Sequence, residues 1–296
     1  MAGIWTMGEL LVEIMRPQAG MQLYEPGEFL GPFPSGAPAI FIDTVARLGH
    51  PAGIIGGVGD DDFGRCVVDR LKTDRVNCDY VQFFPNGVTA VAFVTYFQDG
   101  SRKFIFHFGL TPAVWAKFTG TEKIGQPTFF HVMGCSIMAN DEFRFQIFKA
   151  AEFFSQNGAR ITFDPNIRVE LLGGKNLDEV IGPILEKCSI LFPGVQELHL
   201  LTGKTEIMAG VKKLFEKPPL EIIVLKRGKK GSVVKQESEQ HKIQVYQTKL
   251  INTCGAGDAS AAGFLFFYLR QFNLEECGRM GSYIASRVCG IESSHL

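Results

Sequence analysis

The sequence lacks the features that mark exported, membrane-bound or nucleic-acid-binding proteins. Its first residues, MAGIWTMGELLVEIM, have no basic side chain ahead of the apolar stretch and include two glutamates, which argues against a signal peptide. No apolar run approaches the roughly 18 residues that a membrane span needs. Because 30 basic and 31 acidic side chains give a net charge of -1, we expect no basic field for nucleic acid or an anionic membrane.

The seven cysteines form no C-x-x-C pair. An odd number of scattered thiols suits reduced side chains better than a disulfide framework. Repeats, low-complexity segments and an interdomain linker are also missing. We therefore expect a soluble cytoplasmic protein with a single domain over residues 1–296, whose partners are small molecules.

Short apolar runs alternate with helical patterns in the second half of the chain. Between the first two runs lies a helical segment, with Asp141 as its expected N-cap and Gly158 as its expected stop. A repeated strand-helix-strand pattern predicts an α/β fold with a mostly parallel central sheet flanked by helices on both faces. The runs that we interpret as buried strands are residues 129–133, 161–163, 190–192 and 222–225.

The first third of the chain has a different pattern. Glycine and proline cluster in residues 26–38, and apolar residues alternate with polar ones over residues 88–108 around the expected turn Asp99-Gly100. Together these patterns predict a small β-sheet lid formed by about residues 13–35 and 88–108.

Polar residues follow the predicted strands directly. In open α/β sheets, ligands bind beyond the carboxyl ends of the strands. The segments there gather carboxylates, cations and glycines at one edge of the sheet. They are Gly134-Cys135, residues 164–168 (DPNIR), residues 193–197 (PGVQE) and residues 226–228 (KRG).

The segment NTCGAGD, residues 252–258, runs directly into an apolar helical pattern. Glycines let the backbone approach a ligand closely, and the free N–H groups of a helix N-terminus favour negative charge. The motif therefore predicts an anion site on the amides of Gly255, Ala256 and Gly257, with Asp258 able to act as a general base. On its own, the motif also fits a glycine turn whose acidic residue stabilises the helix dipole.

A second segment, residues 34–64 (PSGAPAIFIDTVARLGHPAGIIGGVGDDDFG), precedes FDPNIR (163–168), LFPGVQEL (191–198) and LKRGKKGSVV (225–234). In this order and spacing, the sequence resembles the ribokinase-like carbohydrate kinases of the PfkB family. The opening MGELLVEI is most similar to fructokinases and 2-keto-3-deoxygluconate kinases. The resemblance implies a ribokinase-like fold that uses ATP and Mg²⁺ to phosphorylate a hydroxyl group of a small sugar.

The resemblance also implies roles for individual residues. Asp258 matches the catalytic base, and Arg168 matches a residue that reaches substrate or phosphate. Glu13 and Gly36 fall at the sugar site, and Glu197 matches the acidic residue that organises Mg²⁺ through water. The residues implied to form the anion hole or border the nucleotide are Gly255, Ala256, Gly257, Lys226, Gly228 and Gly231.

Several of these residues have a plainer interpretation. Glu13 could be a strand residue facing solvent, and Glu197 could be a solvated helix position. Arg168 could pair structurally with Asp164. Lys226 could be an ordinary surface lysine at a strand end.

The sequence departs from the family pattern at four places. Ile40 stands where an asparagine usually helps to hold the sugar, and Gly194 replaces the asparagine of the N-x-x-E motif. Asn252 replaces the aspartate that commonly begins the last motif, which weakens the inference of a monovalent cation site. Residues 106–109 lack an arginine that many sugar-acid and fructose kinases have.

These departures bear on the substrate. A substrate with a carboxylate group would need two cations to bind it, and the sequence shows only Arg168 for this role. We therefore expect a neutral fructose-like sugar ahead of 2-keto-3-deoxygluconate. Phe97, Phe106 and Phe108 could present an apolar face to a sugar ring, but their alternation favours core positions.

Two rival functions remain open. One is a sugar-binding or regulatory protein that keeps the kinase fold without turnover, which the departures at residues 40, 194 and 252 motivate. The other is a nucleoside or phosphosugar kinase, for which only Arg102 and Lys103 offer basic side chains near the lid. The resemblance also implies a homodimer, because the lid edges of this family often pair between subunits.

Overall fold

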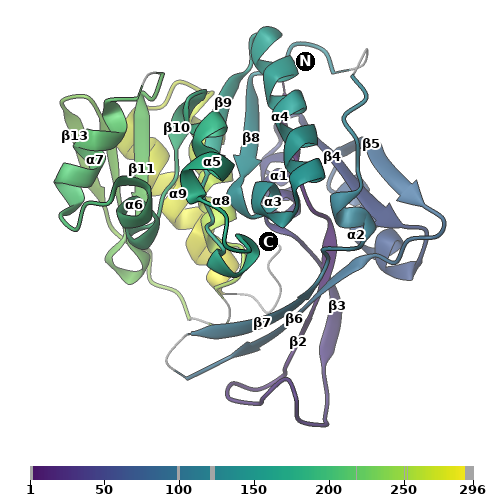
Figure 1. Cartoon of the computed structure of the whole chain (residues 1–296). Coiled ribbons are helices and arrows are strands. Elements are labelled where there is room, and N and C mark those ends of the chain that lie inside the picture. Colours follow the sequence, from purple (N-terminus) through teal and green to yellow (C-terminus); the bar gives the residue numbers. More distant parts are fainter. Residues whose placement is uncertain are drawn as a thin grey trace.

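The computed structural model describes residues 3–98, 101–120, 124–217, 219–249, 251 and 253–290. Within these ranges the strands form a nine-stranded sheet and a separate four-stranded sheet (Figure 1). The order of the large sheet is β13-β12-β11-β10-β9-β8-β1-β4-β5. Neighbours from β11 to β5 are parallel, and only β12 and β13 add antiparallel pairs at one edge. The predicted mostly parallel α/β architecture is confirmed.

The elements have the following bounds. The large sheet contains β1 (Ile4–Met7), β4 (Ala52–Gly59), β5 (Asn77–Phe84), β8 (Phe129–Met133), β9 (Arg160–Asp164), β10 (Cys188–Leu191), β11 (Ile222–Lys226), β12 (Ser232–Gln236) and β13 (Glu239–Ile243). The small sheet contains β2 (Leu11–Met15), β3 (Leu30–Ser35), β6 (Ala90–Tyr96) and β7 (Arg102–His107). The helices are α1 (Ala37–Arg47), α2 (Asp62–Thr73), α3 (Gly134–Ala139), α4 (Asp141–Gln156), α5 (Leu177–Leu185), α6 (Val195–Thr202), α7 (Ile207–Phe215), α8 (Ala256–Tyr268) and α9 (Leu274–Cys289). Short 3-10 turns lie at Pro112–Val114, Val169–Leu171 and Gly228–Lys230.

Helices cover the large sheet on both faces (Figure 1). One apolar core lies under α3 to α7 and includes Phe143 and Leu198. The other lies under α1, α2, α8 and α9 and includes Phe41 and Phe264. Because both faces are buried, strands such as β4 and β8 are buried along their whole length. None of the helices in the described ranges is long and apolar enough to cross a bilayer.

The predicted strands of the second half are all present, with small shifts at their ends. The strand predicted at 129–133 is β8, and those predicted at 161–163 and 222–225 lie within β9 and β11. The strand predicted at 190–192 is β10, which begins and ends earlier. The predicted N-cap Asp141 is wrong, because Asn140 caps α4 by accepting a hydrogen bond from the Phe143 amide at 2.6 Å. Gly158 follows the end of α4 with a φ of 87°.

The small sheet lies below the large one in Figure 1. Its order is β3-β2-β6-β7, and its strands fall close to the predicted ranges 13–35 and 88–108, with β2 beginning two residues earlier. Along β7 half-buried residues alternate with exposed ones, so that Arg102, Phe104 and Phe106 share one face. The expected turn Asp99-Gly100 lies outside the described residues.

Candidate active site

Two cavities meet at the carboxyl edge of the large sheet. The first, of about 210 Å³, lies between the small sheet and the ends of β9 and β11. The second, of about 490 Å³, lies between the turn after β11 and helices α8 and α9. Three residues, Lys226, Thr253 and Gly257, line both cavities. A group that passes from one cavity to the other would therefore pass beside these residues.

The catalytic, sugar, nucleotide and metal residues that the resemblance implies each line one of these cavities. The first is lined by Glu13, Gly36, Arg168, Glu197, Lys226, Gly255, Gly257 and Asp258. The second is lined by Lys226, Gly228, Gly231, Ala256 and Gly257. Asn252 lies outside the described residues.

The N-terminus of α8 forms the wall between the cavities. Gly255 precedes the helix with a φ of 75°, a conformation that favours glycine. No side chain caps this end of the helix. The first backbone N–H groups of an α-helix have no partner within the helix, and the helix dipole makes their surroundings favourable for an anion. This turn can therefore bind a negatively charged group at the junction of the cavities.

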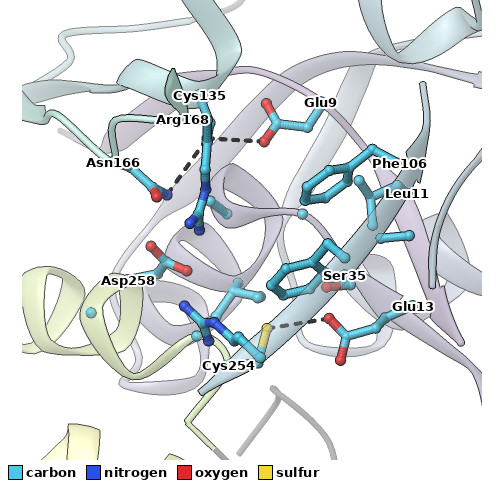
Figure 2. Close-up of a pocket in the computed structure, with 18 of the residues that line it drawn as sticks. Glu9, Leu11, Glu13, Ser35, Phe106, Cys135, Asn166, Arg168, Cys254 and Asp258 are labelled. Atoms are coloured by element: carbon cyan, nitrogen blue, oxygen red, sulfur yellow. Dashed lines mark hydrogen bonds between the residues drawn. The ribbon is translucent and has the colours of Figure 1, made fainter. Parts of the chain in front are cut away.

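Asp258 lies in this first turn and faces the first cavity (Figure 2). Loss of hydration and the nearby carboxylate of Asp164 raise its pKa to about 7, against the opposing effect of Lys226, Arg168 and Arg102. A carboxylate with a pKa near neutrality can accept a proton at physiological pH and is well suited to general-base chemistry.

Two arginines, Arg102 and Arg168, line the first cavity. Arg168 follows β9 and lies near Asp258 (Figure 2), and no ion pair joins it to Asp164 within the described residues. The alternative that Arg168 is a structural partner of Asp164 is therefore wrong. Arg102, at the start of β7, lines the same cavity, and its buried Nη1 has no hydrogen-bond partner among the residues that the structure describes. The sequence analysis placed Arg102 near the lid but counted only Arg168 as a cation for a carboxylate substrate, because the two residues are far apart in the chain.

Glu13 and Gly36 form part of the opposite wall. Glu13 is 2% exposed, and the Cys254 thiol donates a hydrogen bond to its Oε2 at 3.2 Å, so the solvent-facing alternative is wrong. Gly36 precedes α1 with a φ of 111°, and a Cβ there would lie 2.6 Å from the backbone oxygen of Glu9. Only glycine fits at this close approach.

Glu9 also lines the first cavity, and the sequence analysis missed it (Figure 2). The hydroxyl of Ser136 donates to its Oε2 at 2.5 Å, and the thiol of Cys135 donates to its Oε1 at 3.2 Å. Burial raises the pKa of Glu9 despite these hydrogen bonds. The available signal was an acidic residue inside an apolar stretch, four positions before Glu13.

Aromatic and aliphatic side chains complete the first cavity. Ile40 lines it, as expected for an apolar wall at this position. Phe106 and Phe108 line the cavity and also pack with the core, so the two interpretations of these residues do not exclude each other. Phe97 is half-buried and does not line the first cavity.

Glu197 is half-buried in the first turn of α6, so the solvated alternative is wrong. Its Oε2 accepts a hydrogen bond from the Gly194 amide at 2.5 Å, and its Oε1 accepts one from the Ile167 amide at 2.9 Å. No group of three or more potential metal ligands was found among the described residues. Mg²⁺ often keeps several waters and binds through one or two carboxylates and substrate phosphates. Glu197 has lone pairs left for such waters, so the residues present fit a water-mediated site.

Lys226 is more than a surface lysine. Its Nζ makes an ion pair with the fully buried Asp164 at 2.5 Å, and its own side chain is 27% exposed. The second cavity beyond it is lined by glycines, by the hydroxyls of Ser260, Ser282 and Ser286, and by Val245 and Tyr246. Its volume lies within the usual range for small-molecule sites.

The raised pKa of Asp258 predicts that asparagine at this position stabilises the fold. Between about pH 4 and 7 the folded chain keeps a proton on Asp258 that the unfolded chain has released, so the contribution of this group to stability falls as the pH rises. Since the side chain is partly exposed, we expect Asp258→Asn to raise the free energy of unfolding by on the order of 2 kcal/mol at pH 8 and by little at pH 4.

Urea unfolding of both proteins at both pH values measures this difference. The control is Asp62→Asn, which changes an aspartate in the first turn of α2 whose side chain is 98% exposed. An equal effect of Asp258→Asn at the two pH values would contradict the assigned pKa.

Comparison with known proteins identifies the family. The family model "pfkB family carbohydrate kinase" matches residues 30–294. Fructokinase-2 of Solanum habrochaites is 30% identical over 269 residues, which cover 88% of this chain and 80% of the relative. Fructokinase-1 of Oryza sativa subsp. japonica is 30% identical over 265 residues, which cover 88% of this chain and 81% of the relative.

Solved structures agree with this match. The apo crystal structure of a putative ribokinase II from E. coli has a TM-score of 0.94 and 31% identity, and the match covers 99% of this chain and 94% of that one. The structure of a putative ribokinase II from E. coli in complex with ATP and Mg²⁺ has a TM-score of 0.92, with the same identity and coverage. The chain therefore belongs to the pfkB family of carbohydrate kinases.

Proposed function

We propose that this carbohydrate kinase transfers the γ-phosphoryl group of ATP to a hydroxyl group of a neutral, fructose-like sugar bound in the first cavity. The observation that carries the proposal is the junction of the two cavities at the N-terminus of α8, with Asp258 on the side of the first cavity. The junction offers a base to one reactant and a positive helix end to the other.

The lining of the first cavity supports a polyhydroxyl ligand. Glu9 and Glu13 bring carboxylate oxygens that can accept hydrogen bonds from hydroxyl groups. Ile40 and the phenylalanines of β7 offer an apolar surface to the carbon face of a sugar. The volume of about 210 Å³ is smaller than the usual pocket for a drug-sized ligand, which favours a ligand no larger than a single sugar.

The second cavity supports the nucleotide assignment. Gly228, Gly231 and the serines of α8 and α9 line a space large enough for a base and ribose. The phosphates would then extend toward Gly257 and the α8 amides. The relative from E. coli whose structure contains ATP and Mg²⁺ supports the same pair of ligands here.

In the proposed reaction, Asp258 accepts the proton of the attacking hydroxyl. The amides of Gly255, Ala256 and Gly257 stabilise the negative charge of the transferring group, and Arg168 adds a cation on the sugar side. Glu197 would help to hold Mg²⁺ through water, and when bound this ion neutralises charge on the phosphate oxygens. The small sheet acts as a lid that excludes water from the first cavity.

The test is ADP release from Mg-ATP with a panel of ketohexoses, aldoses, nucleosides, phosphosugars and sugar acids. We expect turnover of a ketohexose, and a loss of about 10²–10⁴-fold in kcat for Asp258→Asn because the base is removed. The matched control Asp62→Asn should keep full activity. The kcat/KM of the unmodified protein should fall as the pH drops below about 7, where Asp258 becomes protonated.

Other results would change the assignment. A profile that stays flat from pH 5 to 8 would exclude Asp258 as the base. Sugar binding without any ADP release would favour the inactive sugar-binding alternative, and turnover of a nucleoside or phosphosugar alone would favour the other rival.

A sugar acid is the second candidate substrate, and the pair Arg102 and Arg168 favours it. Both arginines line the first cavity, where they can donate charge-assisted hydrogen bonds to the carboxylate of a substrate. If this candidate is right, 2-keto-3-deoxygluconate should be turned over better than fructose. Arg102→Leu should then lower kcat/KM for the acid by about 10–100-fold, since a hydrogen bond to a charged group is lost.

The matched control for this test is Lys103→Leu, the next residue on β7, which is exposed. It should leave both substrates unchanged. If Arg102→Leu lowered kcat/KM equally for the acid and for the neutral sugar, this result would contradict a carboxylate site at Arg102.

A further inference from the structure

Lys226 holds a position that the proposed reaction leaves without a role. It ends β11, and its side chain lines both cavities. Its Nζ lies 3.5 Å from the position that a Cβ on Gly257 would take, so the ammonium group is beside the first turn of α8. A cation is therefore fixed where a group crosses from one cavity to the other.

Asp164 holds this ammonium group in place. The carboxylate is fully buried at the end of β9, where Oδ2 contacts Lys226 Nζ and Oδ1 accepts a hydrogen bond from the Asn166 amide at 3.2 Å. Glu197 and Asp258 also attract Lys226. The backbone is fixed as well, because the Lys226 amide donates to the Pro193 oxygen at 2.8 Å and bridges to Gly194.

Stability alone gives a weak reason for this pair. A buried ion pair often adds little to stability compared with apolar residues of similar volume. An ammonium group has three N–H donors, and Asp164 is its one hydrogen-bond acceptor in the described part of the chain. The remaining donors can reach acceptors that enter the cavities.

We propose that Lys226 is a catalytic residue of the phosphoryl transfer, with its ammonium group contacting the transferring phosphoryl group, and that Asp164 is the positioning residue that holds it there. This inference rests on the proposed kinase reaction. In that step the acceptor oxygen bonds to the γ-phosphorus, the bond from phosphorus to the leaving ADP oxygen breaks, and the acceptor proton goes to Asp258. Lys226 keeps its protons and offsets the charge on the phosphoryl oxygens.

The test compares a charge-neutral double variant with the unmodified protein. Lys226→Met alone leaves Asp164 buried without its partner and can unfold the chain, so Asp164→Asn/Lys226→Met is the informative variant. The control is Lys230→Met, an exposed lysine of the adjacent turn that lines neither cavity. The readouts are the melting temperature, kcat, and the Kd values of ADP and of the β,γ-imido analogue of ATP by calorimetry.

We expect the double variant to melt within a few degrees of the unmodified protein and to bind ADP within threefold. Its Kd for the imido analogue should rise at least tenfold, and its kcat should fall at least a hundredfold. The Lys230→Met control should change none of these values. A double variant that keeps both the melting temperature and the kcat of the unmodified protein would overturn the proposal, because the pair would then stabilise the fold alone. Equal loss of affinity for ADP and the analogue would also overturn it.

Failure of the proposed substrate is distinguishable from failure of this inference. The unmodified protein could turn over none of the sugars while the double variant still binds the imido analogue at least tenfold more weakly and ADP within threefold. In that case the substrate assignment fails and the role of Lys226 stands. If the unmodified protein binds neither nucleotide, both proposals fail.

Discussion

The first turn of α8 meets the carboxyl edge of the parallel sheet, and the rest of the site depends on this contact. A parallel sheet brings the ends of β9, β10 and β11 to one edge, so Asp164, the Gly194 turn and Lys226 come close together there. The α8 amides then face this group of charges. Acidic side chains and cations are partly dehydrated there, which strengthens the interactions among them.

Charge balance at this junction explains the unusual state of Asp258. Dehydration and Asp164 raise its pKa, while Lys226 and two arginines oppose that rise. The result is a carboxyl group with a pKa of about 7. Such a group accepts a proton readily at physiological pH, but its charged form lowers the stability of the folded chain. Stability and activity are therefore opposed at this residue, as is common where a fold maintains a reactive group.

The two sheets contribute different parts of the binding site. The large sheet fixes the junction through buried strands and two apolar cores. The small sheet contributes one face to the first cavity, with Arg102 and Phe106 on the same side of β7. A ligand in this cavity would contact both sheets, so small-sheet residues can set substrate choice without altering the α8 turn.

The sequence predicted the parts of this arrangement that are local or that belong to long motifs. The βαβ strands and the glycine turn before α8 follow from periodicity and from the backbone freedom of glycine. The site role of Glu9, the shared cavity of Arg102 and Arg168, and the ion pair between Asp164 and Lys226 did not follow, because they depend on contacts between segments far apart in the chain. Asn140 was missed as a cap because Asp141, next to it, has the same capping chemistry.

A crystal structure with the accepted sugar, ADP and a planar fluoroaluminate group would test the central claim most directly. The account predicts that this mimic of the transferring group contacts the Gly257 amide and Lys226 Nζ. It also predicts that the acceptor oxygen lies within about 3 Å of an Asp258 carboxylate oxygen. A sugar outside the first cavity, or a mimic remote from the α8 turn, would contradict the account.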